Sequence, residues 1–119
     1  TMDRPYTGGS FTVAANGAVA FTGGDPTFPA ELRVAEGGKA RTLTDLNASL
    51  RAVKQMGQVR KITAASSHDG LAIEGWLTLP PGYQPGTRVP LILEIHGGPF
   101  QAYGPHFATD NQLYAAAGY

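Results

Sequence analysis

Two glycine-containing turns constrain the first third of the chain more than any other feature of the sequence. Asn16-Gly17 stands between two short apolar runs, 11–15 and 18–22. Asn-Gly is the strongest short hairpin signal, because both central positions of such a turn need a positive φ angle. Gly37-Gly38 repeats the pattern after a segment in which apolar and polar residues alternate. We therefore expect two successive hairpins with four short antiparallel strands.

Four such strands are about the content of one blade of a β-propeller, although a small stand-alone meander fits the same residues. Between Asp45 and Met56 the apolar residues instead recur every three or four positions, as on one face of a short helix. They are Leu46, Leu50 and Val53. Asp45 or Asn47 can cap the start of this helix, and Gly57 can end it. The segment is typical of a linker between two structural units.

Strand signals return from Arg60, on both sides of the turn His68-Asp69-Gly70. Between Pro80 and Pro90 the prolines then exclude a helix or a central strand. The apolar run Leu91–Ile95 is typical of a strand that is buried on both faces of a parallel sheet. Glu94 interrupts this run, and we expect it to be a partnered carboxylate rather than a catalytic one.

The residues from about Thr109 to Ala117 form a helical pattern, and Gly118 is a C-terminal stop signal. A parallel sheet needs a second strand after its crossover helix, and the sequence reaches only Tyr119. The expected fold class is therefore mixed, with antiparallel β-structure followed by the incomplete beginning of an α/β domain.

Charge and composition argue against several classes of function. The nine basic and nine acidic residues balance, whereas a nucleic-acid-binding face needs a basic surplus. No apolar run approaches the ~20 residues of a membrane-spanning helix. The chain has no cysteine, and the spacing of His68, His96 and His106 matches no compact metal-ligand pattern. We expect no metal, no cofactor, no nucleic acid and no membrane as a partner, and the cellular compartment stays open.

The stretch "PLILEIHGGPF" carries the chemistry that the sequence suggests. A strand that runs into a glycine-rich turn is how many hydrolases build an oxyanion hole. Backbone N–H groups of such a turn stabilise the negative charge of an acyl-transfer transition state. Glycine lets the backbone approach closely, so Gly98, supported by Gly97, is the candidate catalytic donor. We expect His96 and Pro99 to shape the turn.

The nucleophile that an oxyanion hole serves is not apparent in the sequence. Its serines are Ser10, Ser49, Ser66 and Ser67. None stands in the G-x-S-x-G elbow of an α/β-hydrolase, and the nearest approach, "GGSFT", lies within an expected hairpin. We therefore expect no Ser-Asp-His triad within these residues.

The order of these parts resembles the domain junction of the prolyl oligopeptidase family of serine peptidases, in its acylaminoacyl-peptidase and dipeptidyl-aminopeptidase-like branches. The resemblance is carried by "DGLAIEGWL", "PPGY" and "LILEIHGGP", which arrive in the family's order, and by the blade-like hairpins before them. It implies a β-propeller joined to an α/β-hydrolase domain with a triad at the interface. It also implies that the Gly98 N–H is one oxyanion donor, and that the triad residues lie beyond the equivalent of Tyr119.

On this basis we expect residues 1–45 to be the last propeller blade, 46–59 a linker helix and 60–119 the N-terminal part of the hydrolase domain. The parent enzyme would hydrolyse short peptides or acylated amino acids. The 119 residues alone would be inactive. Their expected partner is the missing remainder of the hydrolase domain, or a second copy of the chain. An esterase or lipase fragment and a non-catalytic complementation piece are the alternatives.

Overall fold

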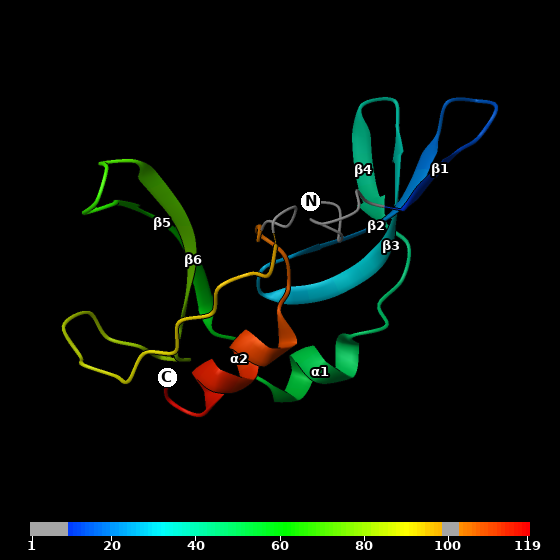
Figure 1. The fold of residues 1–119 in the computed structure, drawn as a ribbon. Coiled ribbons are helices and arrows are strands. Elements are labelled where there is room, and N and C mark those ends of the chain that lie inside the picture. The colour runs from blue at the N-terminus through cyan, green and yellow to red at the C-terminus, as the bar shows by residue number, and fades with distance from the viewer. Residues whose placement is uncertain (1–9, 99–102) are drawn as a thin grey trace.

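The computed structural model describes residues 10–98 and 103–119. In chain order its elements are β1 (Phe11–Val13), β2 (Val19–Asp25), β3 (Phe28–Glu36), β4 (Lys39–Thr42), α1 (Ala48–Val53), β5 (Gln58–Ala65), β6 (Ala72–Leu79) and α2 (Thr109–Ala116). Strands β1 to β4 form one sheet in chain order, and β5 pairs with β6 in a separate hairpin (Figure 1). The described part of the chain is thus mostly antiparallel β-structure with two short helices.

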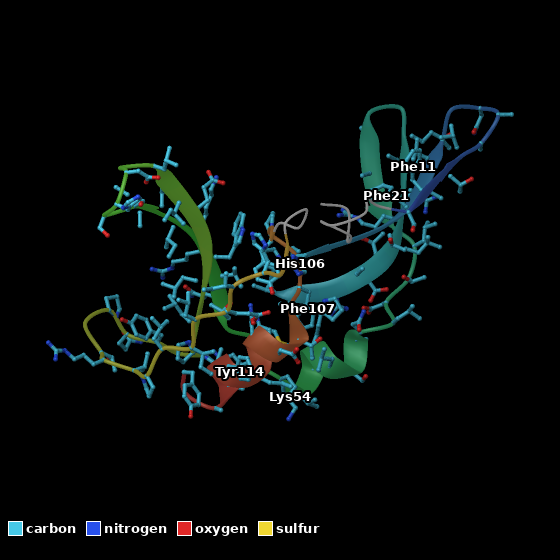
Figure 2. The ribbon with its side chains drawn as sticks, in the orientation of Figure 1. Phe11, Phe21, Lys54, His106, Phe107 and Tyr114 are labelled. Carbon is cyan, nitrogen blue, oxygen red and sulfur yellow. The ribbon has the colours of Figure 1, made fainter. Side chains whose placement is uncertain are left out.

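The four-stranded sheet confirms both expected hairpins. Gly17 has a φ of 82°, and Gly37 and Gly38 have φ values of 56° and 76°, which only glycine adopts at little cost. The first hairpin sets Phe11 opposite Phe21 across neighbouring strands (Figure 2). The expected pairing of short strands is therefore correct, and local turn chemistry explains it.

A third turn, between β2 and β3, completes the sheet and was not singled out in the sequence. The Asp25 carboxylate accepts hydrogen bonds from the backbone N–H groups of Thr27, at 2.7 Å, and Phe28, at 3.0 Å. Aspartate stabilises tight turns through such bonds. The register shifts between Gly23 and Asp25, and at Gly24 a β-carbon would lie 2.9 Å from the Phe28 carbonyl oxygen. Glycine is therefore required where the two strands close on the turn.

The segment after β4 forms a helix, as expected, which begins at one of the two predicted capping residues but ends before the predicted stop. Asn47 occupies the N-cap position without a side-chain capping bond to the helix. Its backbone and side-chain N–H groups instead donate to the Glu31 carboxylate, at 2.9 and 2.8 Å. Gly57 does not end the helix, because the backbone is already extended at Lys54. A competing tertiary interaction thus replaces the local cap.

Glu31 joins the four-stranded sheet to the segment that leads into α1. Its carboxylate also accepts hydrogen bonds from the Thr44 hydroxyl and from the Leu46 N–H. These bonds, with that of Thr44 first, lower the pKa of Glu31 from 4.5 to about 2, because each of them stabilises the ionised form. One acidic side chain of β3 therefore fixes the path of residues 44–47.

The prediction of a buried strand at Leu91–Ile95 is wrong. The segment belongs to no helix or strand, and Leu91, Leu93 and Ile95 are 76%, 76% and 77% exposed. A strand is stabilised by hydrogen bonds to a neighbouring strand, and no described strand pairs with this one. The α/β part of the expected fold class is therefore not formed by the described residues, whose two sheets are both antiparallel.

The buried core is small and lies where α2 packs on the end of β6. Its most buried side chains are Leu79, Ala115 and Gln112.

The radius of gyration is 17.0 Å, whereas a compact domain of this length would have about 13 to 14 Å. Many large apolar side chains are exposed elsewhere in the described chain. Exposed apolar surface on this scale is unusual for a monomeric soluble domain. Within the described residues, no helix is both long and apolar enough to cross a membrane.

Candidate active-site loop

The candidate oxyanion residues Gly97 and Gly98 lie in an exposed loop that follows the extended run Leu91–Ile95. Pro99, which was expected to stiffen this turn, lies outside the described residues. The loop precedes α2 in the chain, and the backbone is described again from Tyr103. The two glycines are therefore accessible at the position where the sequence places the oxyanion donors.

His96 makes a hydrogen bond within this loop. Its Nδ1 lies 2.7 Å from the Gly97 carbonyl oxygen. A carbonyl oxygen only accepts hydrogen bonds, so Nδ1 carries the proton and donates it. The imidazole therefore holds the carbonyl of the peptide that joins Gly97 to Gly98.

Tyr103 contacts two residues that precede the loop. Its hydroxyl donates a hydrogen bond of 2.6 Å to the Glu94 carboxylate. Its ring meets the His96 ring edge to face, with centroids 5.6 Å apart and planes at 84°, which is a favoured aromatic geometry. Glu94 is thus a partnered carboxylate, as expected. Tyr103 was missed in the sequence, where a single tyrosine seven positions after a histidine gives no signal.

The other two histidines make hydrogen bonds to residues close to them in the chain. His106 Nδ1 lies 2.9 Å from the Gly104 carbonyl oxygen, and His68 stands in the turn between β5 and β6. In the described part of the chain no three histidine, aspartate or glutamate side chains are grouped so that they could hold a metal ion.

Ser66, His68 and Asp69 lie close together but do not form a catalytic arrangement. The Ser66 hydroxyl donates directly to the Asp69 carboxylate, and this bond, together with the Leu71 N–H, lowers the pKa of Asp69. The Ser66 oxygen accepts the backbone N–H of His68 at 3.3 Å. In a triad the imidazole stands between the hydroxyl and the carboxylate, whereas here it does not. These residues serve as turn residues, as expected of Ser66 and His68.

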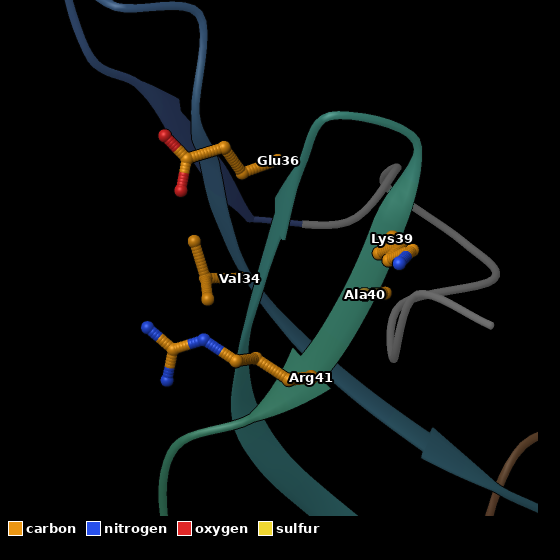
Figure 3. A pocket seen from close by; sticks show the side chains of 5 residues that line it. All are labelled: Val34, Glu36, Lys39, Ala40 and Arg41. Atoms are coloured by element: carbon orange, nitrogen blue, oxygen red, sulfur yellow. The ribbon is translucent and has the colours of Figure 1, made fainter.

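A shallow hollow of about 340 Å³ lies over the hairpin of β3 and β4, apart from the glycine loop. Figure 3 shows Val34, Glu36 and Arg41 on one side of this hairpin. Lys39 and Ala40 complete its lining. All five residues come from a single two-stranded hairpin, so the hollow is a surface depression rather than an enclosed site.

Solved structures that share this arrangement are acylaminoacyl peptidases. One, in complex with Z-Gly-Gly-Phe-chloromethyl ketone, is 31% identical, with a TM-score of 0.77 over 92% of this chain and 17% of that chain. The acylaminoacyl peptidase of Pyrococcus horikoshii, in an orthorhombic crystal form, is also 31% identical, with a TM-score of 0.76 and the same coverage. The resemblance to the acylaminoacyl-peptidase branch of the prolyl oligopeptidase family is therefore confirmed.

A curated relative is also named as a peptidase. The uncharacterized peptidase YuxL of Bacillus subtilis (strain 168) is 43% identical over 54 residues, which are 45% of this chain and 8% of that protein. No protein-family model matches the chain. The chain thus spans about a sixth of the peptidases of known structure and a smaller share of the curated one, and it is homologous to a segment of these enzymes.

Proposed function

We propose that this chain is a segment of a serine peptidase and supplies part of its oxyanion hole through the Gly98 N–H. The observation that carries the proposal is the His96 bond to the Gly97 carbonyl oxygen. It lies within an HGGP sequence of a chain that matches acylaminoacyl peptidases. Short peptides or acylated amino acids are the proposed substrates, in keeping with the peptidyl ligand of the first solved structure.

The proposed reaction is acyl transfer from the substrate to a serine and then to water. As the substrate carbonyl becomes tetrahedral, its oxygen gains negative charge, and the Gly98 N–H would donate to that oxygen. A single donor of this kind contributes about a hundred- to a thousandfold in rate. The triad itself would come from residues outside this chain, because the described Ser66, His68 and Asp69 lack its geometry.

The match over 92% of the chain supports the following proposed organisation. Residues 1–45 would form the last propeller blade, 46–59 the linker and 60–119 the first part of the hydrolase domain. The exposed run Leu91–Ile95 would then pair with strands of the remaining hydrolase domain, or with a second copy of the chain. The exposure of its apolar side chains supports a covered surface in the intact protein.

The test uses the full-length protein that carries this segment. We expect a fluorophosphonate probe to label one serine and to block hydrolysis of acylated amino acids or short peptides. Gly98→Pro, which lacks the N–H, should lower kcat about a hundred- to a thousandfold, while Gly98→Ala keeps the donor and serves as the control. Equal activity of the two variants would contradict the oxyanion role. Hydrolysis of simple esters without any hydrolysis of peptide bonds would favour an esterase instead.

A further inference from the structure

Tyr103 connects the two ends of the candidate loop. Glu94 and His96 precede the glycines, whereas Tyr103 follows them in the chain. The tyrosine hydroxyl bonds to the Glu94 carboxylate at 2.6 Å, and its ring packs edge-on against His96. Glu94 and His96 are both exposed, so tight packing does not hold their side chains. Their contacts with Tyr103 therefore restrict their rotamers.

The His96 bond has a consequence for the N–H of Gly98. The carbonyl of Gly97 and the N–H of Gly98 belong to one planar peptide unit, and in a trans peptide they point in opposite directions. When His96 holds the carbonyl oxygen, the plane can no longer turn freely, and the N–H is directed away from the imidazole. Glycine on both sides would otherwise allow this plane to rotate widely.

Resting on the function proposed above, we propose that Tyr103 is a positioning residue for the oxyanion donor. It acts through His96, whose ring it orients, and it is itself held in place by Glu94. The chain of contacts therefore runs from Glu94 to Tyr103, then to His96, and ends at the peptide between Gly97 and Gly98. Tyr103 touches no reacting atom, and its effect is on the direction in which the donor points.

The first experiment measures the loop itself in the full-length protein. Tyr103→Phe removes the bond to Glu94 and keeps an aromatic ring beside His96. Exchange of the His96 Nδ1 proton with water, measured by NMR, should become about tenfold faster, because its hydrogen bond to the Gly97 carbonyl oxygen opens more often. Tyr83→Phe is the matched control, since the Tyr83 hydroxyl donates a comparable bond of 3.1 Å to the Thr87 carbonyl in a different loop. Unchanged exchange in Tyr103→Phe would overturn the proposal, whatever the activity of the protein.

The second experiment asks whether the restraint serves catalysis. Tyr103→Phe should lower kcat about ten- to a hundredfold, with little change in KM, because small misplacements of a catalytic group have effects of this size. Glu94→Gln keeps an oxygen that accepts the tyrosine hydroxyl and should retain most activity. Glu94→Ala should resemble Tyr103→Phe, and the double variant should be no worse than either single one.

The outcomes separate this inference from the proposed function. If the wild-type protein is not labelled by fluorophosphonate, the peptidase function fails. The comparison of exchange rates between Tyr103→Phe and the wild type still tests whether Tyr103 restrains the loop. If the wild type is active and Tyr103→Phe retains its full kcat, the positioning role is overturned and the peptidase function stands. A clearly larger loss in Glu94→Ala than in Tyr103→Phe would show that Glu94 acts by a route other than Tyr103, which also overturns the positioning role.

Discussion

The side-chain amide of Gln112 forms a reciprocal pair of hydrogen bonds with the backbone of Gly57. The Gly57 N–H donates to Gln112 Oε1 at 2.7 Å, and Gln112 Nε2 donates to the Gly57 carbonyl oxygen at 3.2 Å. The same Nε2 lies 3.3 Å from the Pro26 carbonyl oxygen in the turn between β2 and β3. One buried side chain of α2 thus ties together the start of β5 and the four-stranded sheet.

We predict that Gln112→Leu destabilises the fold by about 1–3 kcal/mol. The substitution leaves the buried N–H and carbonyl of Gly57 without partners, and unsatisfied buried backbone groups have a cost of this size. The free energy of unfolding, measured by urea denaturation of the full-length protein, tests this. Gln84→Ala is the control, because the Gln84 side chain is exposed and donates to the nearby Gly82 carbonyl oxygen. Equal stability of Gln112→Leu and wild type would contradict the prediction.

We predict that Gly57→Ala is also destabilising, by about 1–3 kcal/mol, as is usual for an overpacked core. The added methyl group would collide with the Leu79 carbonyl oxygen and come within 3.1 Å of the Ala115 β-carbon. Backbone atoms cannot move aside as a flexible side chain can. Gly75→Ala provides the contrast, since its methyl group would meet only the Ile62 side chain, at 3.3 and 3.5 Å. Gly57→Ala should therefore have a clearly lower denaturation midpoint than Gly75→Ala.

We predict that protonation of Glu31 contributes to the loss of folding stability at low pH, the acid limb of the stability profile. Its pKa in the folded protein is about 2, below the value of about 4.3 expected when unfolded. Folding therefore favours the ionised form of Glu31. Its contribution to the free energy of unfolding is complete above the unfolded pKa and disappears as the pH falls from about 4.5 towards 2. Glu31→Gln should be less stable at neutral pH, and its stability should fall less steeply over this window.

The prediction is tested by measuring the free energy of unfolding from pH 2 to pH 7 for the wild type, Glu31→Gln and Glu36→Gln. Glu36→Gln is the matched control, because Glu36 lies at the other end of β3 and contacts Asn16 rather than the linker. An acid limb in Glu31→Gln as steep as in the wild type would mean that the Glu31 network does not contribute in solution.

We predict that the 119 residues on their own are inactive and associate with one another. Peptidase assays of this chain should give no serine-dependent turnover, because its described residues form no Ser-His-Asp triad. Leu91, Leu93 and Ile95 are each about three-quarters exposed, and an apolar segment with unpaired backbone groups can form a strand against another chain. The paired substitutions Leu91→Lys and Leu93→Lys should shift the chain towards a monomer in light scattering. A monodisperse wild-type monomer would contradict this expectation.

Local chemistry determined much of the architecture. Asn16-Gly17, Gly37-Gly38 and His68-Asp69-Gly70 specify turns within a few residues, and the three hairpins predicted from them are present. The helix α2 likewise follows from its own residues. Such features are predictable because the interactions that stabilise them lie within one short stretch of sequence.

The tertiary structure decided what depends on partners far along the chain. Leu91–Ile95 has the composition of a buried strand, yet strand formation requires a neighbour, and no described strand supplies one. The local sequence predicts a helix stop at Gly57, whereas in the fold its backbone bonds to a glutamine 55 positions away. Tyr103 carries no motif, and only the folded loop brings its hydroxyl to Glu94 and its ring to His96. A sequence pattern records what each residue prefers locally, but these contacts exist only once distant segments have met.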